Sequence, residues 1–357
     1  MIDVSPITYN VSGISFEVSI SKNYFDKIYE YMLKNNANEL STTNYHFEKK
    51  IYYIVEDDEF FNKLELLKNN EHYEIKEYFR KMFCYRYYIK DSIYILEENK
   101  DWIIEITKSD YIIYVRAEDL LMDVYLLRFL RSIAYGINED QKMILMHGAA
   151  LEYSDKGIVI LGEKGSGKTT LLIKFLENGS NIISNDRIFV TEDLNIIGFP
   201  QALRVGIETF INEEKITSYF NENTFFRIQD EGNSNFKYLI VFNEIQNIFG
   251  AKYKSFQHLK CVIIPEIQIG KECVEIIQLS ELEKKDILER VCFTPIDESF
   301  RYDWIYFSKL NTLDKIENRD IILKKLESTK FIKVKYGTNA TSVEIIKQIN
   351  NYISLLQ

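Results

Sequence analysis

The sequence predicts an α/β protein in which a smaller, strand-rich α+β domain precedes a larger core built on a mixed sheet. Short alternating or apolar segments typical of strands recur before residue 116, and they lie at 14–18, 50–55, 92–96, 102–106 and 111–115. Apolar residues then recur at helical spacing from Glu118 to about Tyr135. An apolar run at 157–161 is followed by a glycine-rich turn and a helix-like stretch at 170–176. We therefore place the domains at 1–140 and 141–357.

The core is predicted from apolar runs separated by turns. They lie at 144–151, 157–161, 181–190, 259–264 and 331–334. The stretch at about 210–255 is polar, aromatic and charged, with breaks at 221–223 and 230–235, so we interpret it as an insertion or lid. From about Ser280 the chain is expected to be mainly helical.

Composition limits the classes of partner. With 357 residues, of which 46% are hydrophobic, the chain can bury a large core in two domains. The formal net charge of −10 argues against a nucleic-acid-coating surface. The four cysteines form no CxxC pair, and no apolar stretch approaches the roughly 20 residues of a membrane span. We expect a cytoplasmic protein with neither nucleic acid nor membrane as partner.

The glycine-rich turn is a complete phosphate-binding loop. Its glycines let backbone N–H groups surround a phosphate chain, and the following helix directs its positive dipole end at the same anion. Lys168 is placed to reach the β and γ phosphates, and the Thr169 hydroxyl to bind Mg²⁺. We expect ATP, with GTP as the alternative, and Mg²⁺. The loop residues assigned to the nucleotide are Gly162, Glu163, Lys164, Gly165, Ser166, Gly167, Lys168, Thr169 and Thr170.

A carboxylate is needed to orient Mg²⁺ or to accept the proton of an attacking hydroxyl, and Asp186 follows the loop by one helix and one strand. An isolated Asp at this place commonly ends a strand or caps a turn. Its position after an apolar strand, on the edge where the loop opens, favours the catalytic interpretation.

These residues resemble the kinase domain of HPr kinase/phosphorylase, which shares its core with phosphoenolpyruvate carboxykinase. The matching segments are 147–150, 162–170 and 179–187. The resemblance implies a phosphate-loop core of the HPr kinase type. It also implies that His147 lies beside the transferring phosphate, that Lys168 and Thr169 hold nucleotide and metal, and that Asp186 serves the acceptor hydroxyl. A lone histidine at a strand end is otherwise most often a core residue.

The sequence departs from that family where two adjacent Asp residues usually stand, because the first is Asn185. An Asn oxygen can bind Mg²⁺ but cannot take a proton, so Asp186 becomes the base of the pair. Members of that family use a further glutamate near the metal, and Glu208 is the nearest candidate for it in this sequence. Arg204 and Arg187 each suit a phosphate or a structural ion pair, and we prefer Arg204 for the nucleotide.

The leading hypothesis is a kinase that phosphorylates a hydroxyl, of Ser or Thr in a peptide or protein. Neither residues 1–140 nor the carboxy-terminal segment matches the bifunctional HPr enzymes. Divergent relatives that share these motifs resemble proteins found with the biosynthesis of modified peptides. The strand-rich first domain is then a candidate for substrate recognition by edge addition. A small-molecule kinase for an amino acid, sugar or nucleoside stays open, as does a non-catalytic nucleotide-binding scaffold. The resemblance is compatible with an oligomer.

Overall fold

The structure is a computed structural model that describes residues 3–35, 45–71, 74–79, 82–119, 121–163, 165–199, 201–222, 226–229, 236–295 and 305–355. The described residues form two compact units, and each is considered by itself. Unit 1 contains those within 3–33, 45–141 and 305–311, and unit 2 contains those within 142–295 and 312–355, together with 34–35. Both units mix helices with sheets, so the predicted α/β class is confirmed at this level.

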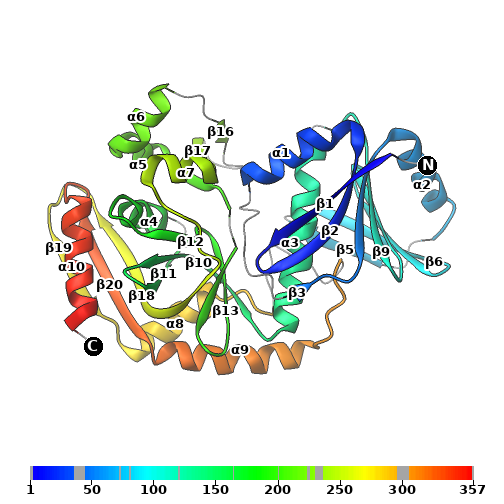
Figure 1. Ribbon diagram of the computed structural model, residues 1–357. Helices are drawn as coiled ribbons and strands as arrows, with labels where there is room; N and C mark the ends of the chain where they lie inside the picture. The colour runs from blue at the N-terminus through cyan, green and yellow to red at the C-terminus, as the bar shows by residue number, and fades with distance from the viewer. Residues whose placement is uncertain are drawn as a thin grey trace. The chain divides into compact units, whose positions relative to one another are not determined.

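Unit 1 is built on a nine-stranded mixed sheet (Figure 1). The strands follow the order β1-β2-β4-β9-β8-β7-β6-β5, and the short β3 pairs with β2. The contacts β2–β4 and β4–β9 are parallel, whereas β5 to β9 form an antiparallel meander. The strands are β1 (Val4–Val11), β2 (Ile14–Ser21), β3 (Tyr45–His46), β4 (Lys50–Val55), β5 (Glu74–Phe79), β6 (Met82–Ile89), β7 (Ser92–Glu97), β8 (Trp102–Ile106) and β9 (Asp110–Val115).

Helices cover both faces of this sheet. Successive strand residues point to opposite sides, so neighbouring residues of one strand contact different helices. On one face, Trp102 packs edge-on against Phe129 of helix α3 (Met122–Asp140). On the other face, the neighbouring Ile103 joins a buried cluster with Phe60 and Leu64 of helix α2 (Asp57–Lys68). A short 3₁₀ turn η1 (Lys22–Tyr24) leads into helix α1 (Phe25–Asn35).

The carboxyl end of α3 anchors residues 305–311 to unit 1. The Asp140 carboxylate accepts hydrogen bonds from the Tyr306 hydroxyl at 2.9 Å, from the Ser308 hydroxyl and from the backbone N–H of Lys309. Because α3 runs to Asp140, it extends beyond the predicted end near Tyr135. Apolar periodicity alone missed this last turn, whose carboxylate is a hydrogen-bond acceptor.

Unit 2 contains an eight-stranded mixed sheet in the order β11-β10-β13-β14-β18-β20-β19, with β12 paired to β10. Strand β11 also pairs with β18, so β11, β10, β13, β14 and β18 close into a ring. The predicted strand at 181–190 is divided by a turn at Asn185 and Asp186. The strands are β10 (Ile144–Tyr153), β11 (Lys156–Leu161), β12 (Asn181–Ser184), β13 (Arg187–Val190), β14 (Asn195–Gly198), β18 (Phe256–Gln268), β19 (Val274–Gln278) and β20 (Lys330–Gly337).

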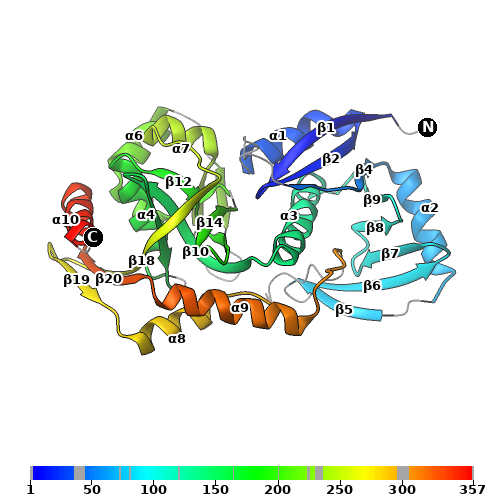
Figure 2. The same cartoon turned by 60° about the horizontal axis from the view of Figure 1, so that its bottom comes forward.

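Two buried clusters lie on unit 2. In one cluster, residues of α4 (Lys168–Glu177) and α10 (Ser342–Leu355) pack with residues of the sheet, and in the other, residues of α8 (Glu281–Val291) and α9 (Thr312–Glu327) do so. Helices α8 and α9 lie side by side in both ribbon views (Figures 1 and 2). Residues 203–249 overlap the predicted insertion at about 210–255. They contribute helices and a three-stranded sheet: β15 (Leu203–Gly206), α5 (Ile207–Asn212), α6 (Glu214–Glu222), β16 (Phe226–Gln229), β17 (Phe236–Ile240) and α7 (Phe242–Phe249).

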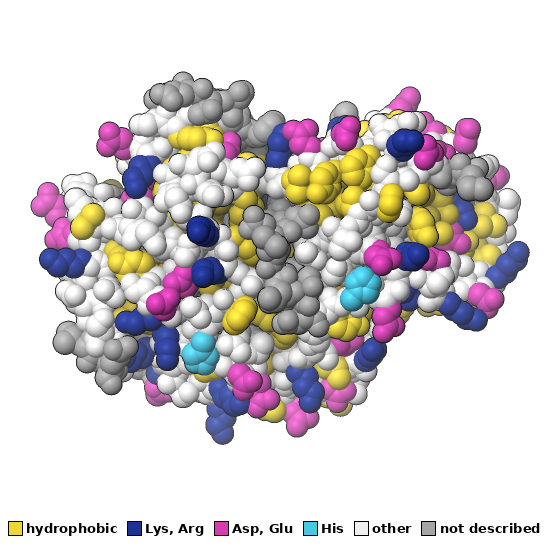
Figure 3. Space-filling view, viewed as in Figure 1, with side chains coloured by type: hydrophobic (Ala, Val, Ile, Leu, Met, Phe, Trp, Pro, Cys, Tyr) yellow, Lys and Arg dark blue, Asp and Glu magenta, His cyan; other side chains and the backbone are white. Residues whose placement is uncertain are grey.

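Side chains of both charges are interspersed over the face seen in Figure 3. Among the described residues, no helix combines the length and the apolar character needed to cross a bilayer.

Candidate functional site

The glycine-rich loop joins the end of β11 to the start of α4, as the sequence predicts. Gly167 caps the helix with φ of +96°, a left-handed conformation that a residue with a Cβ adopts only with strain. Gly165 also has a positive φ, of +85°. The loop therefore turns sharply into the helix, whose first N–H groups have no partner within the helix. Lys164 lies outside the described residues.

The Lys168 ammonium lies inside this turn. It donates hydrogen bonds to the backbone oxygens of Gly162 at 2.7 Å and Glu163 at 3.0 Å. Burial lowers the pKa of Lys168, and the nearby carboxylates of Asp186 and Glu163 oppose that change. A phosphate would supply stronger, charge-assisted acceptors for the same ammonium.

Asn185 and Asp186 form the turn between β12 and β13 beside β10. The backbone N–H of Gly148 donates to the Asp186 backbone oxygen at 2.9 Å, which fixes the turn to β10. The Asn185 amide nitrogen donates to the Ala202 oxygen at 3.0 Å. Its side-chain oxygen is buried and has no hydrogen-bond partner among the described residues. A buried acceptor left in this way is costly unless it meets a donor or a cation.

His147 lies on β10 directly opposite Arg187 of β13. Its Nδ1 is 3.4 Å from an Asp186 carboxylate oxygen, and the imidazole is about one-quarter exposed at 28%. Burial is the main cause that lowers the pKa of His147. The Asp186 carboxylate raises this pKa, and the positive charges of Lys168 and Arg187 lower it further. The structure thus brings together His147, Lys168 and Asp186, which the sequence analysis assigned to catalysis.

Two further residues, Arg187 and Phe293, lie next to this group. Arg187 is buried, and its Nε lies 3.7 Å from the other Asp186 oxygen. The Phe293 ring lies 5.3 Å from the Arg187 guanidinium and 5.8 Å from the His147 ring. Phe293 is held there because its N–H bonds to Leu145 of β10 at 2.8 Å. The signal for Arg187 was its place after Asp186, but only the strand register shows that its side chain faces this site.

A second arginine meets the loop itself. Arg290, at the end of α8, forms an ion pair with Glu163 and another with Asp286 at 2.6 Å. Both partners of the Glu163 pair are well exposed, so the pair contributes little to stability. It does place a guanidinium at the rim of the loop.

Arg204 and Glu208 make none of the contacts described above for this group. Arg204 is exposed on β15, and Glu208 is exposed in the first turn of α5. Within the part of the chain that the structure describes, no hydrogen bond or ion pair joins either side chain to the loop. The segment that carries Glu208 contacts the loop helix through the next residue, because the Thr209 hydroxyl lies 2.9 Å from the Thr170 hydroxyl of α4.

The residues present fit a phosphate and a hydrated Mg²⁺. In the part of the chain that the structure describes, the Ser166 hydroxyl at the loop and the Asn185 oxygen at the adjacent turn are buried polar atoms without hydrogen-bond partners. The described residues contain no group of three or more His, Cys, Asp or Glu side chains arranged to hold a metal. Mg²⁺ does not require such a group, because it is usually held by one or two protein ligands together with phosphates and water. Thr169, Asn185 and Asp186 supply ligand types of that kind.

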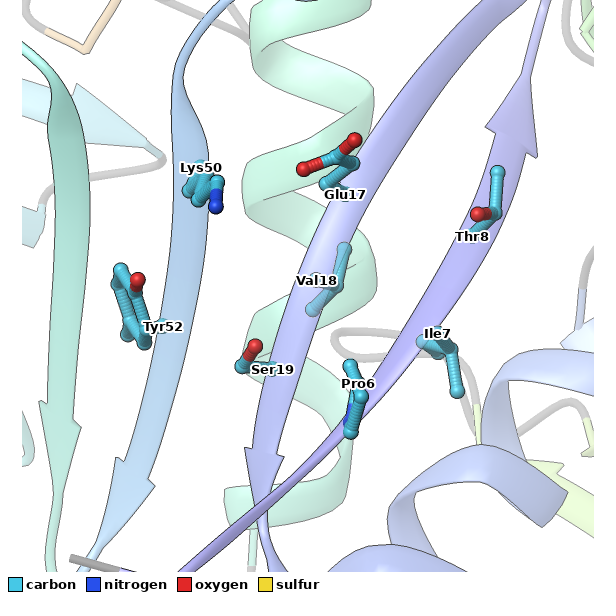
Figure 4. Close-up of a pocket in the computed structure, with 8 residues that line it drawn as sticks. All are labelled: Pro6, Ile7, Thr8, Glu17, Val18, Ser19, Lys50 and Tyr52. Carbon is cyan, nitrogen blue, oxygen red and sulfur yellow. The ribbon is translucent and has the colours of Figure 1, made fainter.

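A separate groove with a cavity volume of about 280 Å³ lies on unit 1 (Figure 4). Its charged and aromatic lining residues are Glu17 of β2 and Lys50 and Tyr52 of β4, and β1 contributes Pro6 and Thr8. It contains none of the residues assigned to nucleotide or metal.

Comparison with known proteins leaves the family open. No protein-family model matches the chain, and no curated protein matches it. One similar solved structure is the Hpr(Ser) kinase/phosphatase from Coxiella burnetii, at 11% sequence identity and a TM-score of 0.28, over 59% of this chain and 97% of that chain. A similarity of this size carries no weight for the function, which we infer from the residues and their geometry.

Proposed function

We propose that this protein is an Mg²⁺-dependent, ATP-using kinase that transfers the γ-phosphoryl group to a hydroxyl, of Ser or Thr in a peptide or protein. The observation that carries the proposal is the position of Asp186. Its carboxylate lies beside the His147 imidazole and acts electrostatically on the Lys168 ammonium of the glycine loop. A nucleotide-binding loop and a candidate base are therefore neighbours.

Each residue has a defined task in this proposal. The loop N–H groups and Lys168 bind the β and γ phosphates, and the Ser166 hydroxyl adds a donor. Thr169 and the Asn185 oxygen hold Mg²⁺, which neutralises charge on the phosphates during transfer. Glu208 and Arg204 are assigned to the metal and to the nucleotide by resemblance.

Asp186 accepts the proton of the acceptor hydroxyl as its oxygen bonds to the γ phosphorus. The bond from that phosphorus to the β–γ bridging oxygen breaks, and ADP leaves. His147 contacts the same carboxylate and lies beside the γ phosphate.

Asn185 favours a second candidate function, a nucleotide-binding scaffold without transfer. Its amide nitrogen is committed to Ala202, and an amide cannot replace the base that an aspartate provides at this place. ATP would then bind without turnover.

Residues 1–140 are proposed to recognise the acceptor, and the groove of unit 1 is where this can be tested. Replacement of Tyr52 by Ala is expected to raise the KM for the acceptor and to leave nucleotide affinity unchanged. An unaltered acceptor KM would oppose this role for the groove.

The decisive experiment is intact-mass spectrometry of candidate acceptors after incubation with the protein, Mg²⁺ and ATP or GTP. Candidates include peptides encoded beside the gene, free amino acids, sugars and nucleosides. A gain of one phosphate that is lost with Asp186→Asn identifies both the kinase and its acceptor. If Asp186→Asn keeps full transfer activity, Asp186 is not the base. Nucleotide binding with no phosphate gain on any acceptor selects the scaffold.

A further inference from the structure

Two polar contacts join the loop helix α4 to the segment that carries Glu208. The first pairs the hydroxyls of Thr170 and Thr209 at 2.9 Å, and the second pairs the Lys174 ammonium with the Glu213 carboxylate at 3.3 Å. Thr170 and Lys174 are four positions apart, about one turn of α4, and Glu213 is the residue that caps the end of α5. The contacts therefore lie one above the other along the same face of α4.

The second contact is deeply buried. Glu213 is 6% exposed and Lys174 is 9% exposed. Apolar residues of the same core surround the segment, including Phe175 of α4 and Phe210 of α5. A buried contact between Lys174 and Glu213 permits few alternative alignments, because a shift of α5 along α4 would separate the two polar groups in an apolar environment. The pair therefore fixes where α5 lies on α4.

The first contact places this alignment next to the proposed metal site. Thr170 follows Thr169, whose hydroxyl is assigned to Mg²⁺, and Thr209 follows Glu208. Both threonines are part-buried, whereas Glu208 is exposed. A hydroxyl pair between the two neighbours limits how far the Glu208 backbone can move from the start of α4.

We propose that Thr209 and Glu213 are positioning residues, which hold α5 on the loop helix so that Glu208 acts on the metal side of a bound nucleotide. The inference rests on the proposed nucleotide site. It adds that residues 207–213 are attached to the loop helix by two side-chain contacts. Neither Thr209 nor Glu213 touches the nucleotide. Each acts through its contact on α4.

The test measures the Mg²⁺ dependence of nucleotide binding, with a fluorescent ATP analogue and no acceptor, so that catalysis is not needed. Thr209→Val removes the hydroxyl at nearly constant shape and is expected to raise the half-saturating Mg²⁺ concentration about fivefold, the effect of one hydrogen bond. Affinity for the metal-free nucleotide should stay unchanged. Thr209→Ser keeps the hydroxyl and should behave like the wild type. Thr329→Val serves as the matched control, because the Thr329 hydroxyl bonds only locally to the Leu326 oxygen within unit 2.

Glu208→Gln completes a double-mutant cycle. It should raise the Mg²⁺ requirement by itself, and the double variant Glu208→Gln/Thr209→Val should be no weaker than Glu208→Gln alone, because the two changes remove one function. Additive losses, or a Thr209→Val variant with the Mg²⁺ dependence of the wild type, would overturn the positioning role.

Hydrogen exchange of the unaltered protein provides a measurement that does not depend on any variant folding. Addition of the ATP analogue with Mg²⁺ should slow amide exchange across 207–213 more than the analogue alone. Equal exchange with and without Mg²⁺, in protein that does bind nucleotide, overturns the inference and leaves the proposed function intact. Wild-type protein that binds no nucleotide overturns both.

Discussion

The His147 Nδ1 lies 3.4 Å from a carboxylate oxygen of Asp186, and the two residues come from separate strands and turns of unit 2. The backbone reinforces this contact, because Gly148, which follows His147, donates its N–H to the Asp186 oxygen. The imidazole therefore meets the carboxylate at a place that the backbone fixes. If Asp186 is the base, His147 controls its orientation.

We expect His147→Asn to lower the transfer rate by about 10- to 100-fold, within the range of general acid–base contributions, while nucleotide affinity stays within about twofold. The reason is that Asn is too short to restore the contact with Asp186. Steady-state kinetics with the identified acceptor, and nucleotide titration, measure the two quantities. His258→Asn, at an exposed site on β18, is the matched control. A loss of nucleotide affinity equal to the loss of rate would instead assign His147 to binding.

Lys168→Ala should abolish measurable nucleotide binding, because it removes the ammonium that the loop encloses. The folded structure should survive, since the ammonium contacts only loop backbone oxygens. Calorimetric titration with ATP and circular dichroism test the two statements. Lys285→Ala, on the exposed side of α8, should bind as the wild type does. Undiminished binding by Lys168→Ala would contradict the assignment of the loop.

The sequence predicted the local parts of this site and missed the tertiary ones. The loop, its strand and its helix are contiguous, and each has a local signal in glycine placement or apolar periodicity. The opposite placement of His147 and Arg187 depends on the register of two strands that are distant in sequence. Arg187 was therefore ranked below Arg204, although Arg187 contacts Asp186 and Arg204 is exposed.

Contacts between distant segments depend on the tertiary fold, which no local pattern specifies. The Phe293 ring reaches His147 from the segment after α8, and Thr209 reaches Thr170 from the predicted insertion. The interior of 181–190 shows the same limit. Its apolar residues resemble one strand, but the polar pair Asn185 and Asp186 forms a turn that separates β12 from β13.

Gly136→Ala should destabilise unit 1 by about 1 to 3 kcal/mol. A Cβ at this position of α3 would overlap the Tyr306 ring, which is also held by its hydroxyl bond to Asp140. This overlap is expected to outweigh the roughly 1 kcal/mol that Ala gains over Gly in a helix. Urea unfolding measures the difference. Gly206→Ala is the control, because a Cβ there meets no atom within 4 Å and its φ is not positive. A stabilised Gly136→Ala variant would show that the Tyr306 segment moves freely.

Lys174→Met should destabilise unit 2 by about 3 kcal/mol at pH 8, because it leaves the Glu213 carboxylate buried without its partner. The double variant Lys174→Met/Glu213→Leu should recover most of this loss, since no unpaired charge then remains. Urea unfolding of both variants at the same pH provides the comparison. If the double variant is as unstable as the single one, lost packing is responsible and the charge is not.

Stability should also depend on pH through Glu213. Burial raises the pKa of Glu213 from 4.5 to about 7, with Glu177 adding to the rise and Lys174 opposing it. Between these values the folded protein keeps a proton that the unfolded chain releases, so this group makes stability fall as pH rises from about 4.5 to 7. Glu213→Gln has no such proton, and its stability relative to the wild type should therefore increase across this range and level off above it. Urea unfolding of both proteins at pH 5, 6 and 8 measures the trend, with Glu289→Gln at an exposed position of α8 as control. A relative stability that decreases with pH would mean that attraction to Lys174 outweighs burial of the carboxylate.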